Sequence, residues 1–398
     1  MSGPRFAAFG SPAFRRYFVA QIVAQTGMWF QTLAVALVVA ERTGSAFALS
    51  GVAVATFTPT LAFAWLAGRA CDRWSPRRIL IASTAVIGAV SPAMIVVLTA
   101  DRLDLLALYV ALALSGSAAT FARIAAQSLV FELVGGSLLQ NASIWASMMA
   151  STARIAGPGL AGATIALVGE AGSLIVNTVL AVVGAILVAT IRERDLVPRR
   201  AQSGPGNARP ARVRLAAPVV TVIAMNGVVC LVAMNIAIGL TAIVTFEFGG
   251  DATVLGLSHS LNAIGAVAAA LVLTRLRRVT PVVAALGALA FAVGQLLTAA
   301  PPWIIVFLGM TGLLGLGMGL FQSGVATAVQ TGTPPAQLGR AMSLVNLTSF
   351  GALPFGAVLL GALIELLGPR AALAVDGGVC AVVALVTLLM LRRLGRRT

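Results

Sequence analysis

The sequence predicts an all-α integral membrane protein with twelve transmembrane helices in two pseudo-symmetric six-helix bundles. Three observations predict this class. The 398 residues are 59% hydrophobic and only 10% charged, whereas about a quarter of the residues of a soluble domain are charged. Long apolar runs recur along the whole chain, and a basic stretch separates two similar halves. A soluble protein this apolar could not cover its own surface, so soluble classes are excluded.

The twelve spans follow from a window of about 20 apolar residues, the length that crosses the hydrocarbon core. Pro158 and Pro354 lie inside expected spans, which membrane helices tolerate. The first span has no small-residue cleavage site after it, so we expect it to remain in the protein as a helix. The expected spans are 17–40, 47–67, 79–100, 105–126, 139–166, 172–191, 215–246, 253–273, 280–300, 303–328, 340–366 and 371–391.

Orientation follows from arginine, which supplies every basic residue of a chain with net charge +15. Cytoplasmic loops carry the excess of basic residues, so we expect both termini in the cytoplasm and the protein in the plasma or inner membrane. The cytoplasmic group is then Arg69, Arg73, Arg77, Arg78, Arg340 and the arginines within 192–214, 275–278 and 392–397. The opposite loops hold Arg42, Arg102, Arg370, Glu41, Asp101, Asp104, Glu170, Glu247 and Asp251.

Two halves are expected, 1–191 and 215–398, joined by a basic cytoplasmic linker at 192–214. The interval from Gly51 to Arg73 equals that from Gly256 to Arg278. The stretches SLLQNAS and AQLGRAM also precede the two span prolines in the same order. A duplicated six-helix unit leaves such a pattern.

Several classes of partner are excluded. No polar stretch is long enough for a nucleic-acid-binding fold. Without lysine there is no P-loop, so no nucleotide-driven pump is expected. Cys71, Cys230 and Cys380 lie far apart and lack metal-ligand spacing. We find no paired acids and no His or Cys clusters at catalytic spacing, so we expect the protein to be neither an enzyme nor a metal- or cofactor-binding protein. Separately, we expect a monomer.

The stretch GRACDRWSPRR (68–78) concentrates charge between two apolar runs. It resembles the loop signature G-x-x-x-D-R-x-G-R-R-K/R of the major facilitator superfamily, with Ser75 and Pro76 departing from it. ERTGSAFALSG, ARIAGPGLAG and GRAMSL resemble the branch that contains siderophore exporters and macrolide-type drug efflux pumps. The matching residues are Gly68, Asp72, Arg73, Arg77 and Arg78.

Asp72 is a carboxylate at the expected cytoplasmic rim. It can pair with arginine or with the positive N-terminal end of a facing helix, and such a pair would latch the two halves in one conformation. Gly68 would let another backbone approach a helix end. Alternatively, the arginines are orientation signals only, and for Arg77 and Arg78 orientation alone is a sufficient explanation.

The fifth span carries ARIAGPGLAG, which resembles in part the antiporter signature G-x-x-x-G-P-x-x-G-G. Gly157, Pro158 and Gly162 match it, while Ala153 and Ala161 replace glycines. Small residues at this spacing permit close packing and a bend, with or without a role in coupling. Arg154 is costly inside a span and marks either function or a buried partner.

The resemblance implies a central cavity lined by spans one, four, seven and ten. Neutral polar residues on these spans suit a bulky amphipathic small-molecule substrate, although helix-to-helix hydrogen bonding is the plainer explanation of each. Gln21, Gln25 and Trp29 share one helix face, being four residues apart. The cavity candidates are Gln21, Gln25, Trp29, Asn226, Asn235 and Gln322.

Relatives of this branch commonly carry an aspartate where Met28 stands. The usual membrane-embedded proton carrier is thus missing from the first span, which argues against simple proton antiport. The remaining candidate proton carriers are Asp376, His259 and Glu132. Asp376 stands at the repeat equivalent of Asn177. We predict an alternating-access exporter. The alternatives are an importer or lipid translocator of the same fold, or a non-transporting sensor or assembly partner.

Overall fold

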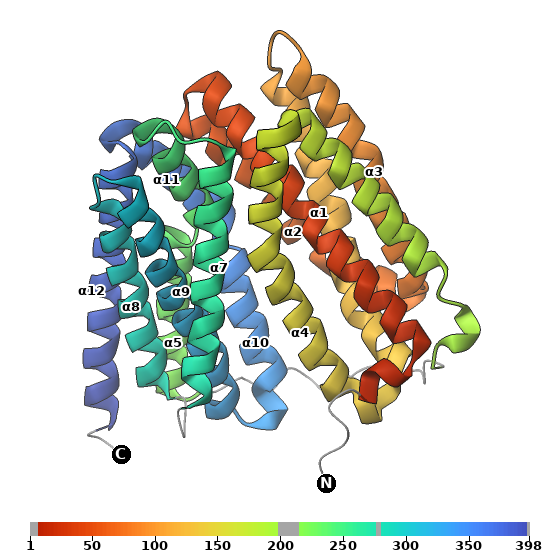
Figure 1. The fold of residues 1–398 in the computed structure, drawn as a ribbon. Helices are drawn as coiled ribbons and strands as arrows, with labels where there is room; N and C mark the ends of the chain where they lie inside the picture. Colours follow the sequence, from red (N-terminus) through yellow and green to blue (C-terminus); the bar gives the residue numbers. More distant parts are fainter. Residues whose placement is uncertain (1–6, 198–214, 276–279, 396–398) are drawn as a thin grey trace. The chain divides into compact units, whose positions relative to one another are not determined.

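The computed structural model describes residues 7–197, 215–275 and 280–395, and over these ranges the ordered elements are all helical (Figure 1). The earlier helices are η1 (Ala7–Gly10), α1 (Pro12–Thr43), α2 (Ala46–Arg73), α3 (Pro76–Thr99), α4 (Leu105–Ala189) and η2 (Glu193–Asp195). The later ones are α5 (Ala217–Ala233), α6 (Ile236–Ala242), η3 (Ile243–Glu247), α7 (Ala252–Thr274), α8 (Pro281–Ala299), α9 (Ile304–Gly332), α10 (Pro335–Phe350), α11 (Leu353–Leu367) and α12 (Pro369–Gly395).

Eleven helices within the described residues are long and apolar enough to cross a membrane, one fewer than the sequence predicts. The difference arises in α4, which covers three expected spans without a loop between them. Gly135 and Gly169 interrupt its helical geometry with φ angles of 69° and 74°, and only glycine adopts such angles readily. Met148–Ala189, counted once, has 42 residues, about twice the length of one crossing. In Figure 1, α4 accordingly does not run as one straight rod.

Two expected spans that the sequence predicts as single helices are broken in the structure. The span at 215–246 is divided at Met234 and Asn235, between α5 and α6, and then ends in the π-helical turn η3. The span at 340–366 is divided at Gly351 and Ala352, between α10 and α11, directly before Pro354. Proline lacks the N–H that would continue the helix, which accounts for the second break.

Two acidic residues of the expected loops cap the N-terminal ends of helices. Asp104 accepts a hydrogen bond from Ala107 N (3.0 Å), and Asp251 accepts one from Val254 N (3.0 Å). Both carboxylates thus cap free N–H groups in the first turn of a helix. These acids of the expected non-cytoplasmic loops therefore have a local structural role as well.

The chain forms two compact units, called unit 1 (residues 1–38 and 55–208) and unit 2 (39–54 and 209–398). In unit 1, α3 packs along α4. In unit 2, α8 packs against both α9 and α12, α7 packs against α9, and α5 packs against α12 (Figure 1). The linker expected at 192–214 lies mostly outside the described residues, as do Arg277 and Arg278.

Residues 39–54 join unit 2 through the end of α11. Glu365 accepts hydrogen bonds from the Ser45 hydroxyl and from Phe47 N (3.1 Å) at the N-terminus of α2. A Cβ atom on Gly361 would overlap the Ser50 hydroxyl, so α2 and α11 are in close contact there. The carboxylate also lies where the positive end of the helix dipole stabilises it.

Candidate functional site

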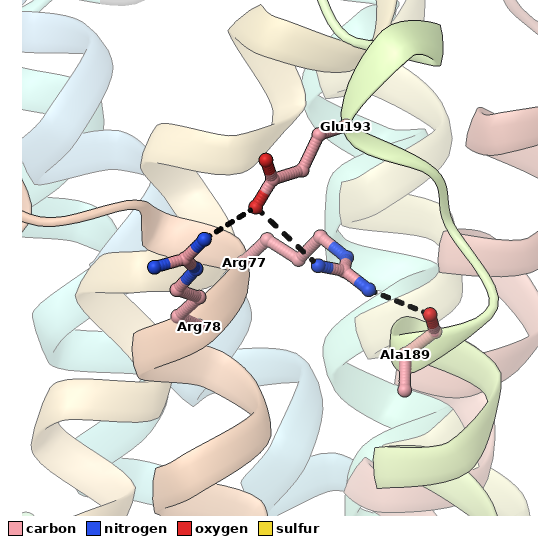
Figure 2. Close-up of polar contacts among 4 residues, drawn as sticks. All are labelled: Arg77, Arg78, Ala189 and Glu193. Atoms are coloured by element: carbon pink, nitrogen blue, oxygen red, sulfur yellow. Dashed lines mark hydrogen bonds and ion pairs between the residues drawn. The ribbon is translucent and has the colours of Figure 1, made fainter.

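The charged loop after α2 contains an ordered cluster within unit 1, drawn in Figure 2. The Arg77 guanidinium donates a hydrogen bond to Ala189 O (2.6 Å), at the C-terminal end of α4, and lies 3.9 Å from Glu193. Arg78 donates to the same Glu193 carboxylate at 3.0 Å. A cation at a helix C-terminus satisfies free carbonyl groups and favours the helix dipole. Arg77 therefore fastens α3 to the end of α4, and both arginines tie α3 to η2 through Glu193, beyond any role in orientation.

The remaining residues of this loop motif behave differently. Asp72 and Arg73, at the C-terminal end of α2, are exposed within unit 1. A Cβ atom on Gly68 would meet no described atom within 4 Å, so the close backbone approach expected at this glycine is absent from the described residues. The motif thus divides into an internal anchor, Arg77 and Arg78, and an exposed pair at the rim.

The polar residues of the first span are only partly explained by packing. Asn177 donates hydrogen bonds to Ser91 Oγ (2.6 Å) and to Gln31 Oε1 (3.3 Å), and Gln31 also bonds to Ser115 (3.3 Å). These four side chains form one network between α1, α3 and α4. The three predicted cavity residues of α1 lie outside it. Gln21 is buried, whereas Gln25 and Trp29 are half-buried.

The antiporter-like stretch of α4 packs against one of these residues. Gly157 has no room for a side chain, because a Cβ atom there would overlap the Trp29 indole. Pro158 and Gly162 are buried, whereas Arg154 is exposed in unit 1. The structure therefore brings Trp29 and Gly157 together and leaves the Arg154 guanidinium at the surface of its unit.

The two broken spans of unit 2 meet at a polar contact. Asn235, at the α5–α6 break, donates a hydrogen bond to Leu353 O (3.2 Å) at the start of α11. Gln322 of α9 lies beside the same break, with Nε2 3.8 Å from Met234 Sδ. Discontinuous helices with free backbone groups form binding sites in many transporters. Asn235 and Gln322, both predicted from sequence, are thus gathered at one place, with Gln322 exposed.

Asn226 has a packing role. Its amide donates to Thr348 Oγ1 and Ser349 Oγ, each at 2.9 Å, and so links α5 to α10. Hydrogen bonds of this kind join helices inside membranes. Because its donors are committed, Asn226 is less available to a substrate than Gln322.

The three titratable candidates are all buried. Glu132, near the end of the first part of α4, is 6% exposed, and His259 of α7 is 9% exposed. Asp376 of α12 is fully buried at 0%, and neither of its carboxylate oxygens has a hydrogen-bond partner among the described residues. Within the described part of the chain, no three His, Cys, Asp or Glu side chains are grouped so that they could hold a metal ion.

Sequence reasoning missed Glu193, Met234 and Gln295. Glu193 lies in a stretch expected to be a featureless linker. Gln295 of α8 donates to Ala233 O (3.2 Å), while its Oε1 atom has no described partner. A glutamine in the middle of an otherwise apolar helix was the available signal for it, since such residues are costly in hydrocarbon.

Known proteins give two kinds of match. The major facilitator superfamily model described as "transmembrane secretion effector" matches residues 3–396. The nucleoside transporter NupG shares the fold with a TM-score of 0.75 at 12% identity, covering 95% of this chain and 99% of that one. A bacterial homologue of the iron transporter ferroportin matches at 0.72 and 18% identity, covering 94% and 98%. A peptide transporter, POT, matches at 0.74 and 14% identity, covering 97% and 95%.

None of the curated protein sequences matches the chain significantly. At these identities the solved structures establish the fold and leave the substrate open.

Proposed function

Since the chain belongs to the transmembrane secretion effector family of the major facilitator superfamily, we propose that this transporter is an exporter of amphipathic small molecules, such as drugs or siderophore-like compounds. It works by alternating access, in which two halves rock about a central site. The observation that carries the substrate class is the neutral polar character of the helix break at Asn235, with Gln322 exposed beside it. The family's description as a secretion effector supports the outward direction.

The proposed topology has twelve crossings with both termini in the cytoplasm of a plasma or inner membrane. Met148–Ala189 crosses twice and reverses at Gly169, since its 42 residues are too long for one crossing. The arginine-rich loops then lie on the cytoplasmic side. The halves are 1–191 and 215–398.

Asp72 is the proposed latch between the halves. Arg77 and Arg78 are committed to Ala189 and Glu193 inside unit 1, whereas Asp72 is exposed at the rim. An exposed carboxylate there is free to meet the positive end of a helix from the other half in one conformation and to release it in the other.

The coupling ion is proposed to be the proton, exchanged for substrate. Asp376, His259 and Glu132 are the candidate carriers, and Asp376 has the strongest support because both of its oxygens lack partners among the described residues. His259 and Glu132 each make other interactions.

A transport assay tests the proposal. Deleting the gene should raise the intracellular level of a substrate found in a panel of siderophores, macrolides and other amphipathic compounds. Asp72→Asn should fail to restore export while reaching the membrane, whereas the control Asp195→Asn, at another exposed acid of unit 1, should restore it. Unchanged accumulation across the panel would contradict export and favour an importer, a lipid translocator or a sensor.

Coupling has its own measurement. Uptake into inverted vesicles should collapse when a protonophore dissipates the proton gradient. Uptake that continues at the same rate would remove the proton from the mechanism.

A further inference from the structure

Asp376 is a buried carboxyl group with neither a counter-charge nor a hydrogen-bond partner among the described residues. It lies on α12 at 0% exposure, and neither oxygen has a hydrogen-bond partner among the described residues. An ionised carboxylate in such a place is strongly disfavoured, and buried acids of this kind take up a proton. The residues around it all belong to unit 2.

The neighbouring helix α8 adds another buried acceptor without a described partner. Gly377, the next residue, packs on α8, where an added Cβ atom would lie 3.2 Å from Gln295 Cβ and 3.1 Å from Ala292 O. Gln295 Nε2 is committed to Ala233 O of α5, and its Oε1 atom has no described partner. Three buried acceptor oxygens are therefore left on facing helices, and one proton would give them a donor.

The titratable and charged groups of the elements packed on α12 offer no cation. α8 and α6 contain no ionisable residue, and the thiols near Asp376 are Cys230 of α5 and Cys380 of α12 itself. Glu365 of α11 bonds to the N-terminus of α2.

The nearest arginine along α12 is also committed elsewhere. Arg370 bonds to Glu247 of η3 (3.2 Å) and to Pro301 O (2.5 Å). The described residues around Asp376 thus include no positive charge that could hold it ionised.

We propose that Asp376 is a proton-binding site, and that its carboxylic O–H donates to Gln295 Oε1. The carboxylate binds one proton from the aqueous phase and is then a neutral carboxylic acid at this buried position. A hard metal ion such as Ca²⁺ takes 6–8 oxygen ligands, more than the three atoms available here. A role of this proton in driving export rests on the proposed function.

Infrared difference spectroscopy on the purified full-length protein tests the site directly. The wild-type spectrum minus that of Asp376→Asn, both at neutral pH, should contain the carbonyl-stretch band of a protonated carboxylic acid. The substitution preserves shape, and unchanged thermal unfolding would establish that the variant is folded. Carboxylate bands in place of the carbonyl band would overturn the proposal.

The hydrogen-bond partner is tested on α8. Gln295→Met removes the acceptor at similar volume, so the acid band should persist and move to higher wavenumber as its hydrogen bond is lost. Thr298→Val is the matched control, because that buried hydroxyl donates within its own helix to Gly294 O, and it should leave the band in place. A band that Gln295→Met does not move would refute the pairing.

The spectrum needs no substrate, so it separates the site from the proposed function. A wild-type protein that shows the acid band but transports nothing in the panel would overturn the proposed export and leave the proton site standing. An Asp376→Asn variant that still exchanges substrate for protons would overturn the coupling role of this acid.

Discussion

Arg77 and Arg78 are adjacent, equally charged and equally suitable as orientation signals, yet the structure gives them different surroundings. The Arg77 side chain is 16% exposed and donates at 2.6 Å to Ala189 O, whereas that of Arg78 is 73% exposed and pairs with a half-exposed Glu193. We therefore predict that Arg77→Ala destabilises unit 1 much more than Arg78→Ala.

The magnitudes follow from these contacts. A hydrogen bond to a charged group contributes about 1.5–3 kcal/mol, and the buried stem of Arg77 adds packing. The Arg77 Nε atom is buried without a partner among the described residues, which offsets part of this gain. We therefore expect Arg77→Ala to cost about 2 kcal/mol, in the lower part of that range. An exposed ion pair such as that of Arg78 contributes about 0–1 kcal/mol. For a unit of this size, 1 kcal/mol shifts the unfolding temperature by about 2–4 °C.

Thermal unfolding with a thiol-reactive fluorescent dye measures the difference. All three cysteines are buried, so a background with Cys230→Ala and Cys380→Ala leaves Cys71 as the reporter of unit 1. Arg77→Ala should lower the unfolding temperature by about 4–8 °C, and Arg78→Ala by less than about 4 °C. The smaller effect should disappear at high salt, because exposed pairs are screened.

Arg77→Lys separates anchoring from orientation. It keeps the positive charge that orients the loop but lacks the planar fork of arginine, so anchoring predicts an intermediate unfolding temperature. Equal losses for the two alanine variants, or a wild-type temperature for Arg77→Ala in correctly inserted protein, would refute the reasoning.

Three further effects can be measured with the same dye. Gly315→Ala should destabilise unit 2 by about 1–3 kcal/mol, because its Cβ atom would overlap Asn262 O of α7, whereas Gly309→Ala on the same helix, with no described atom within 4 Å, should be neutral or slightly stabilising. Asn177→Leu should cost about 1 kcal/mol by removing two hydrogen bonds inside the membrane; no change would mean that this network contributes nothing. Glu365→Gln should lower the unfolding temperature by removing a negative charge from the N-terminus of α2, and an unchanged temperature would show that this contact is dispensable.

Composition and span length were enough to predict the fold class. In a chain with 10% charged residues, apolar runs of about 20 residues have few explanations other than transmembrane helices. The superfamily follows from the loop motif and from the family match. The breaks in the helices were not predicted. Hydropathy counts apolar residues and carries no information on whether a helix ends at Asn235 or continues through it. The Asn235 side chain there donates to Leu353 O, which comes from a distant span.

The partners of individual polar residues were not predictable from the sequence. Sequence placed Asn226 and Gln322 in one class, as neutral polar groups on cavity helices. In the structure, the Asn226 amide is committed to two hydroxyls of α10 while Gln322 is exposed beside a break. Which donors are already satisfied depends on helix rotation and on partners far away in sequence, and neither is visible in a single apolar run.

The repeat expected from the sequence gives a further reason to measure Asp376 first. Asn177, which the repeat expected from the sequence pairs with Asp376, donates to Ser91 of α3 and to Gln31 of α1, so the amide in unit 1 is satisfied without a proton. In unit 2 the facing residue is Gln295, and Ser91 and Gln295 lie at nearly the same distance from Pro76 and Pro281, which begin their helices. Exchanging an amide for an acid there replaces a donor with acceptors and leaves a place that only a proton fits. If the two halves arose by duplication, unit 2 gained a titratable group in its last span, while the first span of the chain has Met28 where relatives commonly carry an aspartate.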